Sequence, residues 1–116
     1  MISIGTANEK GTVIITCAFT DEDSNAVAPS SIKWTLVDSF GNIINSREQV
    51  SVSVPASSIE IILSGDDLQI TTRDRNTEYA DRYIVIEAIY DSDAGTDLPL
   101  KDQANFKIEN LKYIGT

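Results

Sequence analysis

A run of seven residues, Asp91-Ser92-Asp93-Ala94-Gly95-Thr96-Asp97, has the composition of a calcium-binding loop. Carboxylates at alternate positions supply hard oxygen ligands, and a glycine permits the sharp turn that such loops need. The spacing differs from that of an EF-hand, because the twelfth position holds Asp102 rather than a bidentate glutamate. Aspartate and glycine are also common in plain hairpin turns. We favour a solvated turn here and keep Asp91, Asp93 and Asp97 as calcium candidates.

Two further acidic groups have residue types that can do chemistry. Asp21-Glu22-Asp23 is a second, weaker calcium candidate, which would matter most if both acidic runs lay at one end of the fold. A carboxylate pair for glycoside hydrolysis would have to come from Asp66, Asp67, Asp74, Glu78 and Asp81. Paired acids arise easily by chance in so acidic a chain, so we do not expect a hydrolase.

The residue types needed for other common active sites are missing. Histidine is absent, which excludes Ser-His-Asp and Cys-His catalysis and the commonest zinc ligand sets. The single cysteine, Cys17, alternates with Val13, Ile15 and Phe19 on one face, so we expect a small core residue rather than a reactive thiol. We therefore predict a protein that is not an enzyme and binds no cofactor.

The charge balance limits the partners. The chain has 9 basic and 18 acidic residues in 116, a net charge of −9. Such a surface repels phosphate backbones and anionic lipid, so we expect no nucleic acid and no membrane as partner. The first residues do not have the pattern of a secretory signal. One cysteine allows no internal disulfide, which fits a virion or host-cytoplasm location.

Alternation of apolar and polar residues places these groups on strands. A period of two puts one strand face on a core and the other in water. The expected strands are 13–19, 32–36, 50–54, 59–63, 83–90 and 106–108. Turn residues separate them, and Phe40-Gly41-Asn42 predicts a tight hairpin. Several short strands at this spacing are typical of a sandwich or barrel.

The segment around residues 79–90 also has helical spacing, but its β-branched run favours a strand. Even-numbered residues from Ile84 to Tyr90 form the uncharged face, which we expect to be the core. Tyr83, Val85 and Ile89 would then lie outside, as would Ile14 on the first strand. Outward apolar residues on neighbouring strands predict an interface. The alternative is that a loop over residues 68–80 covers them.

The layout resembles an immunoglobulin-like domain. Cys17 stands mid-strand like the first core cysteine, and Trp34 follows on a later strand like the core tryptophan. Val85 stands where the second cysteine would be, so the bridge is missing. Asp81-Arg82-Tyr83 is similar to a tyrosine corner, but that reading would turn Glu87 into the core, and we discount it.

A second resemblance is to small uncharacterised proteins of tailed phages and prophages. The stretches that carry it are Trp34 to Asp38, Gly41 to Ser46, Leu63 to Leu68 and Tyr90 to Ser92. The likeness implies a structural or accessory protein of a head, neck or tail module, and it brings no catalytic residues.

These arguments lead to one all-β domain over residues 1–116, an immunoglobulin-like antiparallel β-sandwich. The expected function is non-enzymatic packing against other virion proteins or against a second copy. The alternative is a carbohydrate- or cell-surface-binding module, for which Tyr79, Tyr83 and Tyr113 are the available aromatic platforms.

Overall fold

The chain forms eight strands and one short 3₁₀ helix in a computed structural model, which describes residues 2–4, 7–70 and 78–111. One sheet has three strands in the order β1-β3-β6, and the other has five in the order β2-β8-β7-β4-β5. The bounds are β1 Ile2–Ile4, β2 Ala7–Asn8, β3 Thr12–Ala18, β4 Ser31–Asp38, β5 Val50–Ser51, β6 Ser58–Ser64, η1 Gly65–Leu68, β7 Tyr79–Ser92 and β8 Gly95–Glu109. The all-β prediction is confirmed.

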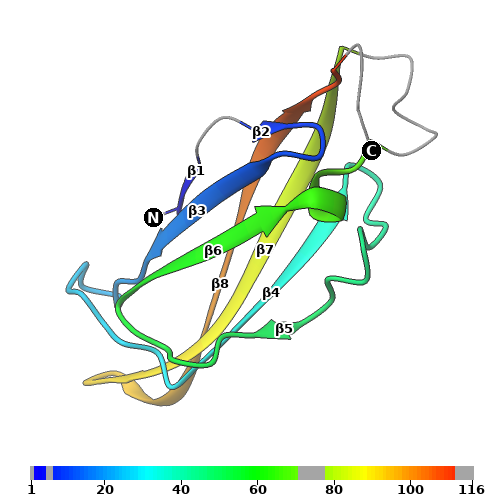
Figure 1. Cartoon of the computed structure of the whole chain (residues 1–116). Helices are drawn as coiled ribbons and strands as arrows, with labels where there is room; N and C mark the ends of the chain where they lie inside the picture. The colour runs from blue at the N-terminus through cyan, green and yellow to red at the C-terminus, as the bar shows by residue number, and fades with distance from the viewer. Residues whose placement is uncertain (1, 5–6, 71–77, 112–116) are drawn as a thin grey trace.

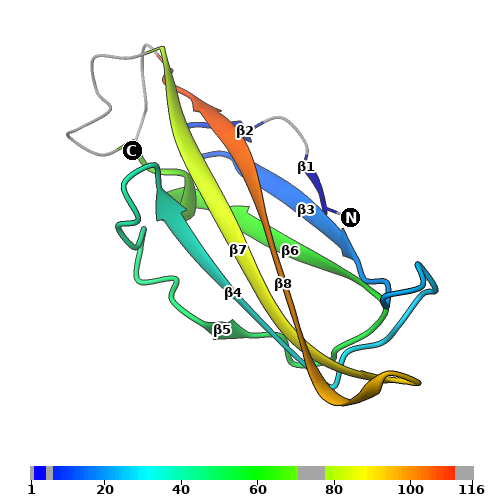
Figure 2. The same cartoon turned by 180° about the vertical axis from the view of Figure 1, so that it is seen from behind.

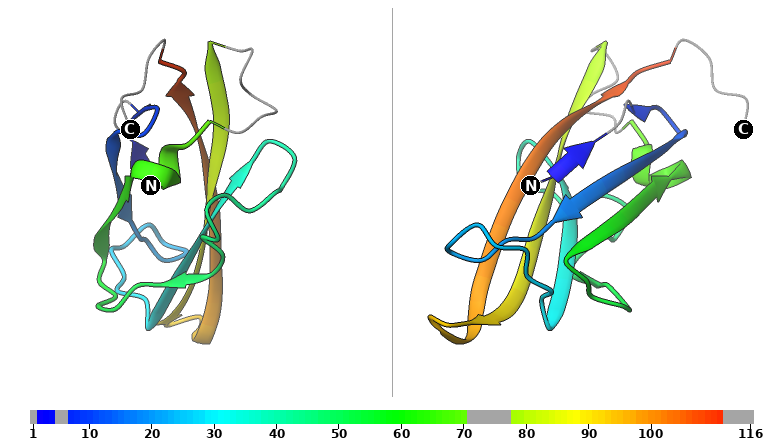
Figure 3. Two further views of the ribbon diagram at one scale, coloured as in Figure 1. Left: turned by 45° about the vertical axis from the view of Figure 1, so that its right-hand side comes forward. Right: turned by 90° about the vertical axis from the view of Figure 1, so that its left-hand side faces the viewer.

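The two sheets lie face to face. β1, β3 and β6 form the near layer in Figure 1, and β4, β7 and β8 form the near layer in the reverse view of Figure 2. The left view of Figure 3 shows the two layers nearly edge-on. Buried side chains from both sheets form one core cluster, in which Ile15, Leu36 and Ile84 are fully buried.

Strict alternation explains why these segments are strands. β3 and β6 each alternate between exposed and buried residues along their whole length. They pair antiparallel with Ile15 opposite Ile61, so both buried rows face the second sheet. On β7, Ile84, Ile86 and Ala88 are buried, which confirms the even-numbered residues as its core face. The predicted strand at 83–90 is therefore confirmed, and it is longer than expected.

Two expectations about the strands were wrong. The predicted strand at 50–54 is only β5, and Val54 is 75% exposed. Its neighbour β4 begins at Ser31, and the last backbone bond between them runs from the Val52 N–H to the Ile32 carbonyl. Only Ser31 of β4 lies beyond that point, so the strand pairing ends before Val54. The second error is that the five-stranded sheet is mixed, because β2 pairs parallel with β8.

The expected hairpin at Phe40-Gly41-Asn42 is a turn held by Asp38. The Asp38 carboxylate accepts hydrogen bonds from the backbone N–H groups of Phe40 and Asn42. Gly41 has a φ of 85°, a conformation that glycine adopts without strain. Beyond the turn, the Ile44 N–H donates to the Leu36 carbonyl, so the chain returns along the edge of β4.

A buried arginine lies in the same row as the apolar core of β7. The Arg82 side chain is fully buried. Its guanidinium donates to the carbonyl oxygens of Asp81 and Gln69, at 2.7 and 3.2 Å. Its register partners are Asp38 on β4 and Phe106 on β8. Two backbone carbonyls therefore bind the buried guanidinium, and its charge helps to lower the pKa of Asp38.

The layering predicts a large loss of stability for one isoleucine of β6 and almost none for its neighbour. Ile61 is 4% exposed and Ile62 is 62% exposed. We expect Ile61→Ala to lower the free energy of unfolding by about 2–4 kcal/mol, because it leaves a cavity in the core. Ile62→Ala should change it by less than about 0.5 kcal/mol. Urea unfolding of both variants measures this, and equal losses would contradict the assignment of the two faces.

Candidate interaction surface

The outer face of the five-stranded sheet carries three of the four expected interface residues. Tyr83 and Val85 are half-buried and Ile89 is 39% exposed, all on the side of β7 that faces away from the core. In register, Val37 lies beside Tyr83 and Thr35 beside Val85. We call this surface, formed by the outward residues of β4, β7 and β8, the outer face.

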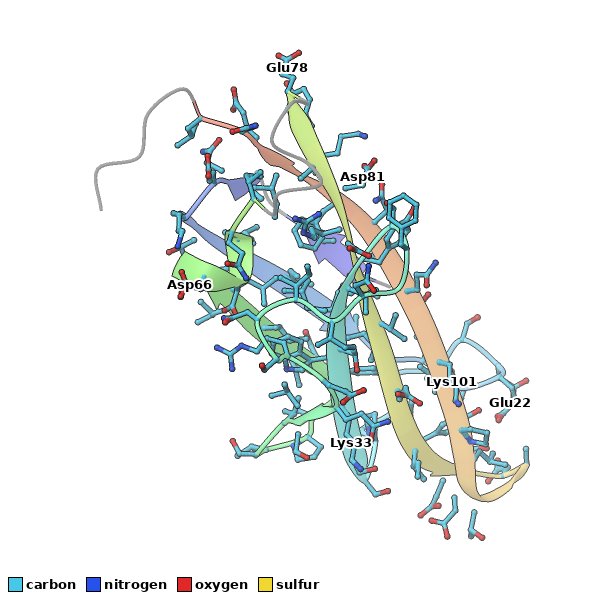
Figure 4. The ribbon with its side chains drawn as sticks, turned by 90° about the vertical axis from the view of Figure 1, so that its right-hand side faces the viewer. Glu22, Lys33, Asp66, Glu78, Asp81 and Lys101 are labelled. Atoms are coloured by element: carbon cyan, nitrogen blue, oxygen red, sulfur yellow. The ribbon has the colours of Figure 1, made fainter. Side chains whose placement is uncertain are left out.

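A charged row and a groove cross the outer face next to Val85. Lys33 on β4 and Lys101 on β8 flank Glu87 on β7, and the Lys101 ammonium lies 3.5 Å from the Glu87 carboxylate. Figure 4 shows Lys33 and Lys101 on either side of β7. With Ser31, Gln49, Ile89 and Pro99 they line a groove of about 310 Å³. The face thus combines apolar contact area with a fixed pattern of charge.

The fourth expected interface residue, Ile14, lies on the opposite side of the molecule. It projects from β3 in the three-stranded sheet and is 47% exposed. Its register partner is Ile62 on β6. Sequence alternation placed Ile14 outside, but it did not show that Ile14 and Tyr83 belong to different sheets. The four residues therefore form two separate surfaces rather than one patch.

The loop expected to cover the outer face falls partly outside the described residues. Residues 71–77 are not described, while Leu68 and Ile70 are buried in the core. Tyr79 and Ala80 belong to β7 itself. The described part of the 68–80 segment therefore contributes to the core and to β7 itself.

The two acidic runs meet at one end of the fold. Glu22 accepts hydrogen bonds from the Tyr90 hydroxyl at 3.3 Å and the Ser92 hydroxyl at 2.8 Å. Burial and the neighbouring Glu22 carboxylate raise the pKa of Tyr90. Among the described residues, only Asp21, Glu22 and Asp23 group their carboxylates closely enough to share a cation. The two runs therefore converge, and Glu22 joins them.

Local hydrogen bonds occupy two of these carboxylates. Asp21 accepts from the N–H groups of Asp23 and Asn25, each at 2.9 Å. Asp91 accepts from the N–H of Asp97 at 2.8 Å, across the β7–β8 turn. Asp91, Asp93 and Asp97 do not come together as a ligand set within the described part of the chain. Their contacts are those of turn-forming residues, as favoured for this segment.

The carboxylates considered for hydrolysis are dispersed. Asp66 pairs with Lys10, and Asp81 pairs with Lys107 at 2.8 Å. The hydrogen bond and charge of Lys107, together with a hydrogen bond from Asn105, outweigh burial and lower the pKa of Asp81. Glu78 is exposed, and Asp74 lies outside the described residues. Each described acid therefore has its own surroundings, and no two of these acids are seen to share one site.

Asp67 forms a buried polar anchor that the sequence did not reveal. The side chain is 2% exposed and accepts from Arg47 Nε at 2.7 Å and from Asn45 Nδ2 at 2.9 Å. The Ser64 N–H donates to its second oxygen at 3.2 Å. Arg47 also lies over the Trp34 ring, 5.9 Å from its centroid. This anchor ties the 42–49 loop of one sheet to the end of β6 in the other.

Cys17 and Trp34 belong to the core. Cys17 is buried, and that burial raises the pKa of its thiol to about 11. The expected burial of Trp34 is confirmed. Of the tyrosines considered as sugar platforms, Tyr79 is 47% exposed, Tyr83 is half-buried, and Tyr113 lies outside the described residues. The described residues thus offer one well-exposed tyrosine and no aromatic row.

Comparison with known proteins gives no relatives: no family model, curated protein or solved structure matches this chain. The described residues also contain no helix with the length and apolar character needed to cross a bilayer.

The Asp67 anchor predicts a pH-dependent stability. Burial raises the Asp67 pKa, but hydrogen bonds from Arg47, Asn45 and Ser64 lower it further, so it lies below its ordinary 3.8. A depressed folded-state pKa stabilises the fold above the unfolded-state pKa, and this contribution disappears as pH falls through the folded-state value. We expect Asp67→Asn to lower the unfolding free energy at pH 7 by about 1–3 kcal/mol, because the charged hydrogen bond to Arg47 is lost. The loss stays in this range because the partly exposed Arg47 side chain can be solvated by water.

Urea unfolding between pH 7 and pH 3 measures this difference. The gap between the wild type and Asp67→Asn should narrow as the pH falls below about 4. Asp66→Asn is the matched control, because Asp66 is the exposed neighbour of Asp67 and pairs with Lys10 at the surface. A constant gap across the pH range would show that the Asp67 charge does not stabilise the fold.

Proposed function

We propose that this chain is an immunoglobulin-like domain acting as a non-enzymatic structural or accessory protein of a tailed-phage particle. The strand order supports the fold assignment. Strands β1, β3 and β6 occupy the places of strands A, B and E, and β8, β7, β4 and β5 those of G, F, C and C′. The segment between β5 and β6 would hold the D strand, and here it has no strand.

Two core residues also support the immunoglobulin-like assignment. Cys17 lies on β3 and Trp34 on β4, both facing the core, as the first cysteine and the tryptophan do in such domains. Val85 faces outward and is not the counterpart of the second cysteine. Ile86 shares a pocket lining with Cys17 and is the better counterpart.

The outer face is the observation that carries the proposed packing role. A solvated strand face usually bears polar side chains. Here Tyr83 and Val85 follow one another along β7, with Val37 beside Tyr83 on β4, and Glu87 separates them from Ile89. Phe40 and Ile43, at the turn that follows β4, add exposed fractions of 68% and 38%. Apolar area of this kind gains free energy when a partner protein covers it.

The charged row gives the outer face a means of selecting its partner. Charge complementarity fixes orientation and suppresses wrong partners more than it adds affinity. Lys33, Glu87 and Lys101 lie directly beside the Thr35–Val85 row. A partner must therefore match an alternating charge pattern as well as an apolar strip. The assignment to a phage particle rests on the sequence resemblance alone.

A lysine at the centre of the outer face tests the packing role. Val85→Lys should reduce incorporation into purified particles at least tenfold, because burying an unpaired ammonium is unfavourable by several kcal/mol. Thr16→Lys, on the outward side of the three-stranded sheet, is the matched control and should incorporate normally. Both proteins should unfold within about 1 kcal/mol of wild type in urea.

Two outcomes would count against this proposal. Normal incorporation of Val85→Lys would show that the outer face is not the contact surface. Absence of the wild-type protein from purified particles would remove the virion role itself. Quantitative mass spectrometry of the particles distinguishes these outcomes.

A further inference from the structure

β6 presents a bare backbone edge. Two flanking hydrogen bonds fix the direction of its polar groups: the Phe19 N–H donates to the Ser57 carbonyl at 2.8 Å, and the Gly65 N–H to the Gly11 carbonyl at 3.0 Å. Pairs of this kind recur every second residue, so odd-numbered residues of β6 bond to β3. The N–H and C=O groups of Ser58, Glu60 and Ile62 therefore point away from the sheet. Within the described residues, β6 pairs only with β3.

The two long edges of the other sheet are protected. The chain from Ile44 to Val52 returns along β4, with hydrogen bonds at Leu36 and Ile32. On β8, Pro99 lacks a donor, and the Asp102 carboxylate accepts from the Gln103 N–H at 2.8 Å. Proline, charge and local bonding are the devices by which proteins prevent strand addition. On β6 these devices are Glu60 and, at the end of the strand, the Asp67 carboxylate that accepts from the Ser64 N–H, so Ser58, Glu60 and Ile62 keep their outward backbone groups.

An exposed apolar pair adjoins the bare edge. Ile62 on β6 is 62% exposed, and its register partner Ile14 on β3 is 47% exposed. The pair lies on the outward side of the three-stranded sheet, away from the core. An added strand would meet both unpaired backbone groups and apolar side-chain area at the same place.

We propose that a second copy of this chain adds to the edge of β6, antiparallel, with the two-fold axis at Ile62. The two three-stranded sheets then join into one six-stranded sheet. Ile62 of one copy lies opposite Ile62 of the other, and Ile14 of each copy extends the apolar strip. Each Glu60 N–H then donates to the Ser64 carbonyl of the other copy, while the Ser64 N–H stays bonded to Asp67 of its own chain.

Charge selects the two-fold axis. An axis at Glu60 would place like charges directly opposite one another, which is destabilising. An axis midway between Glu60 and Ile62 would set each carboxylate against an isoleucine. The axis at Ile62 separates the two carboxylates and collects the apolar side chains. A second copy fits this edge because the same donors, acceptors and isoleucines meet their equivalents about the axis.

The pairing uses a different sheet from the outer face, so it holds whether or not the proposed function is correct. Two chains of net charge −9 repel each other, and salt screens that repulsion. Association should therefore strengthen as sodium chloride is raised. This direction is opposite to that of a contact held by salt bridges.

Cysteine cross-linking of the purified chain tests the proposal and its register. In the proposed dimer, the two copies of residue 62 are direct neighbours, so Ile62→Cys should form a covalent dimer under mild oxidation. Ile14→Cys is the matched control, since three strand spacings of about 4.8 Å separate its copies, beyond disulfide reach. We expect Ile62→Cys to cross-link at least tenfold faster. Wild type should remain monomeric on non-reducing gels because Cys17 is buried.

Each outcome decides the question. Equal cross-linking rates for Ile62→Cys and Ile14→Cys would indicate random collision and overturn the proposal. Faster cross-linking by Glu60→Cys than by Ile62→Cys would overturn the register. Light scattering at high protein concentration gives a second measurement: Ile62→Lys should abolish the salt-promoted dimer, and Thr16→Lys, one strand from the edge, should retain it. Unchanged dimerisation of Ile62→Lys would also overturn the proposal.

Discussion

The requirement that every buried backbone group find a hydrogen-bond partner determines how this small two-sheet fold is built. Two sheets that share one core leave strands at their margins, and each margin needs its own solution. β2 covers only the end of β8, where Ala7 pairs with Ile108. The returning chain covers β4. The short strand β2 and the returning chain therefore supply hydrogen-bond partners at the margins of the five-stranded sheet.

Polar side chains complete the structure where backbone pairing stops. Asp38 bonds the turn that follows β4, and burial there is outweighed by hydrogen bonds from Asn42 and Phe40, which lower its pKa. Asp67 takes the Ser64 N–H at the end of β6 and receives Arg47 from the other sheet. Asp38 thus satisfies donors of the turn beyond β4, and Asp67 satisfies the donor at the end of β6. With no disulfide available, such anchors supplement the apolar core in fixing the loops to the sheets.

The sequence predicted the core faces well because a period of two is a local property. Val13, Ile15 and Trp34 are buried as alternation requires, and so are Ile84 and Ile86. It did not predict Arg82, because a charged residue in a core row contradicts the pattern until its carbonyl partners are known. It missed the Asp67–Arg47 contact for a related reason: the partners lie twenty positions apart in the chain. Alternation also identified Ile14 as outward without showing to which sheet Ile14 belongs.

The two surfaces left by this architecture differ in what they can bind. The outer face has its backbone fully engaged in the sheet around Val85, so only side chains are available there, and a partner must match their shape and charge. The edge of β6 offers backbone donors and acceptors whose spacing every strand shares, so side chains alone limit what adds to it. On that edge, Glu60 restricts register while Ile62 favours contact. A surface of the first kind suits one specific partner, whereas the second suits an identical chain, because a two-fold axis is the simplest way to match a strand with itself.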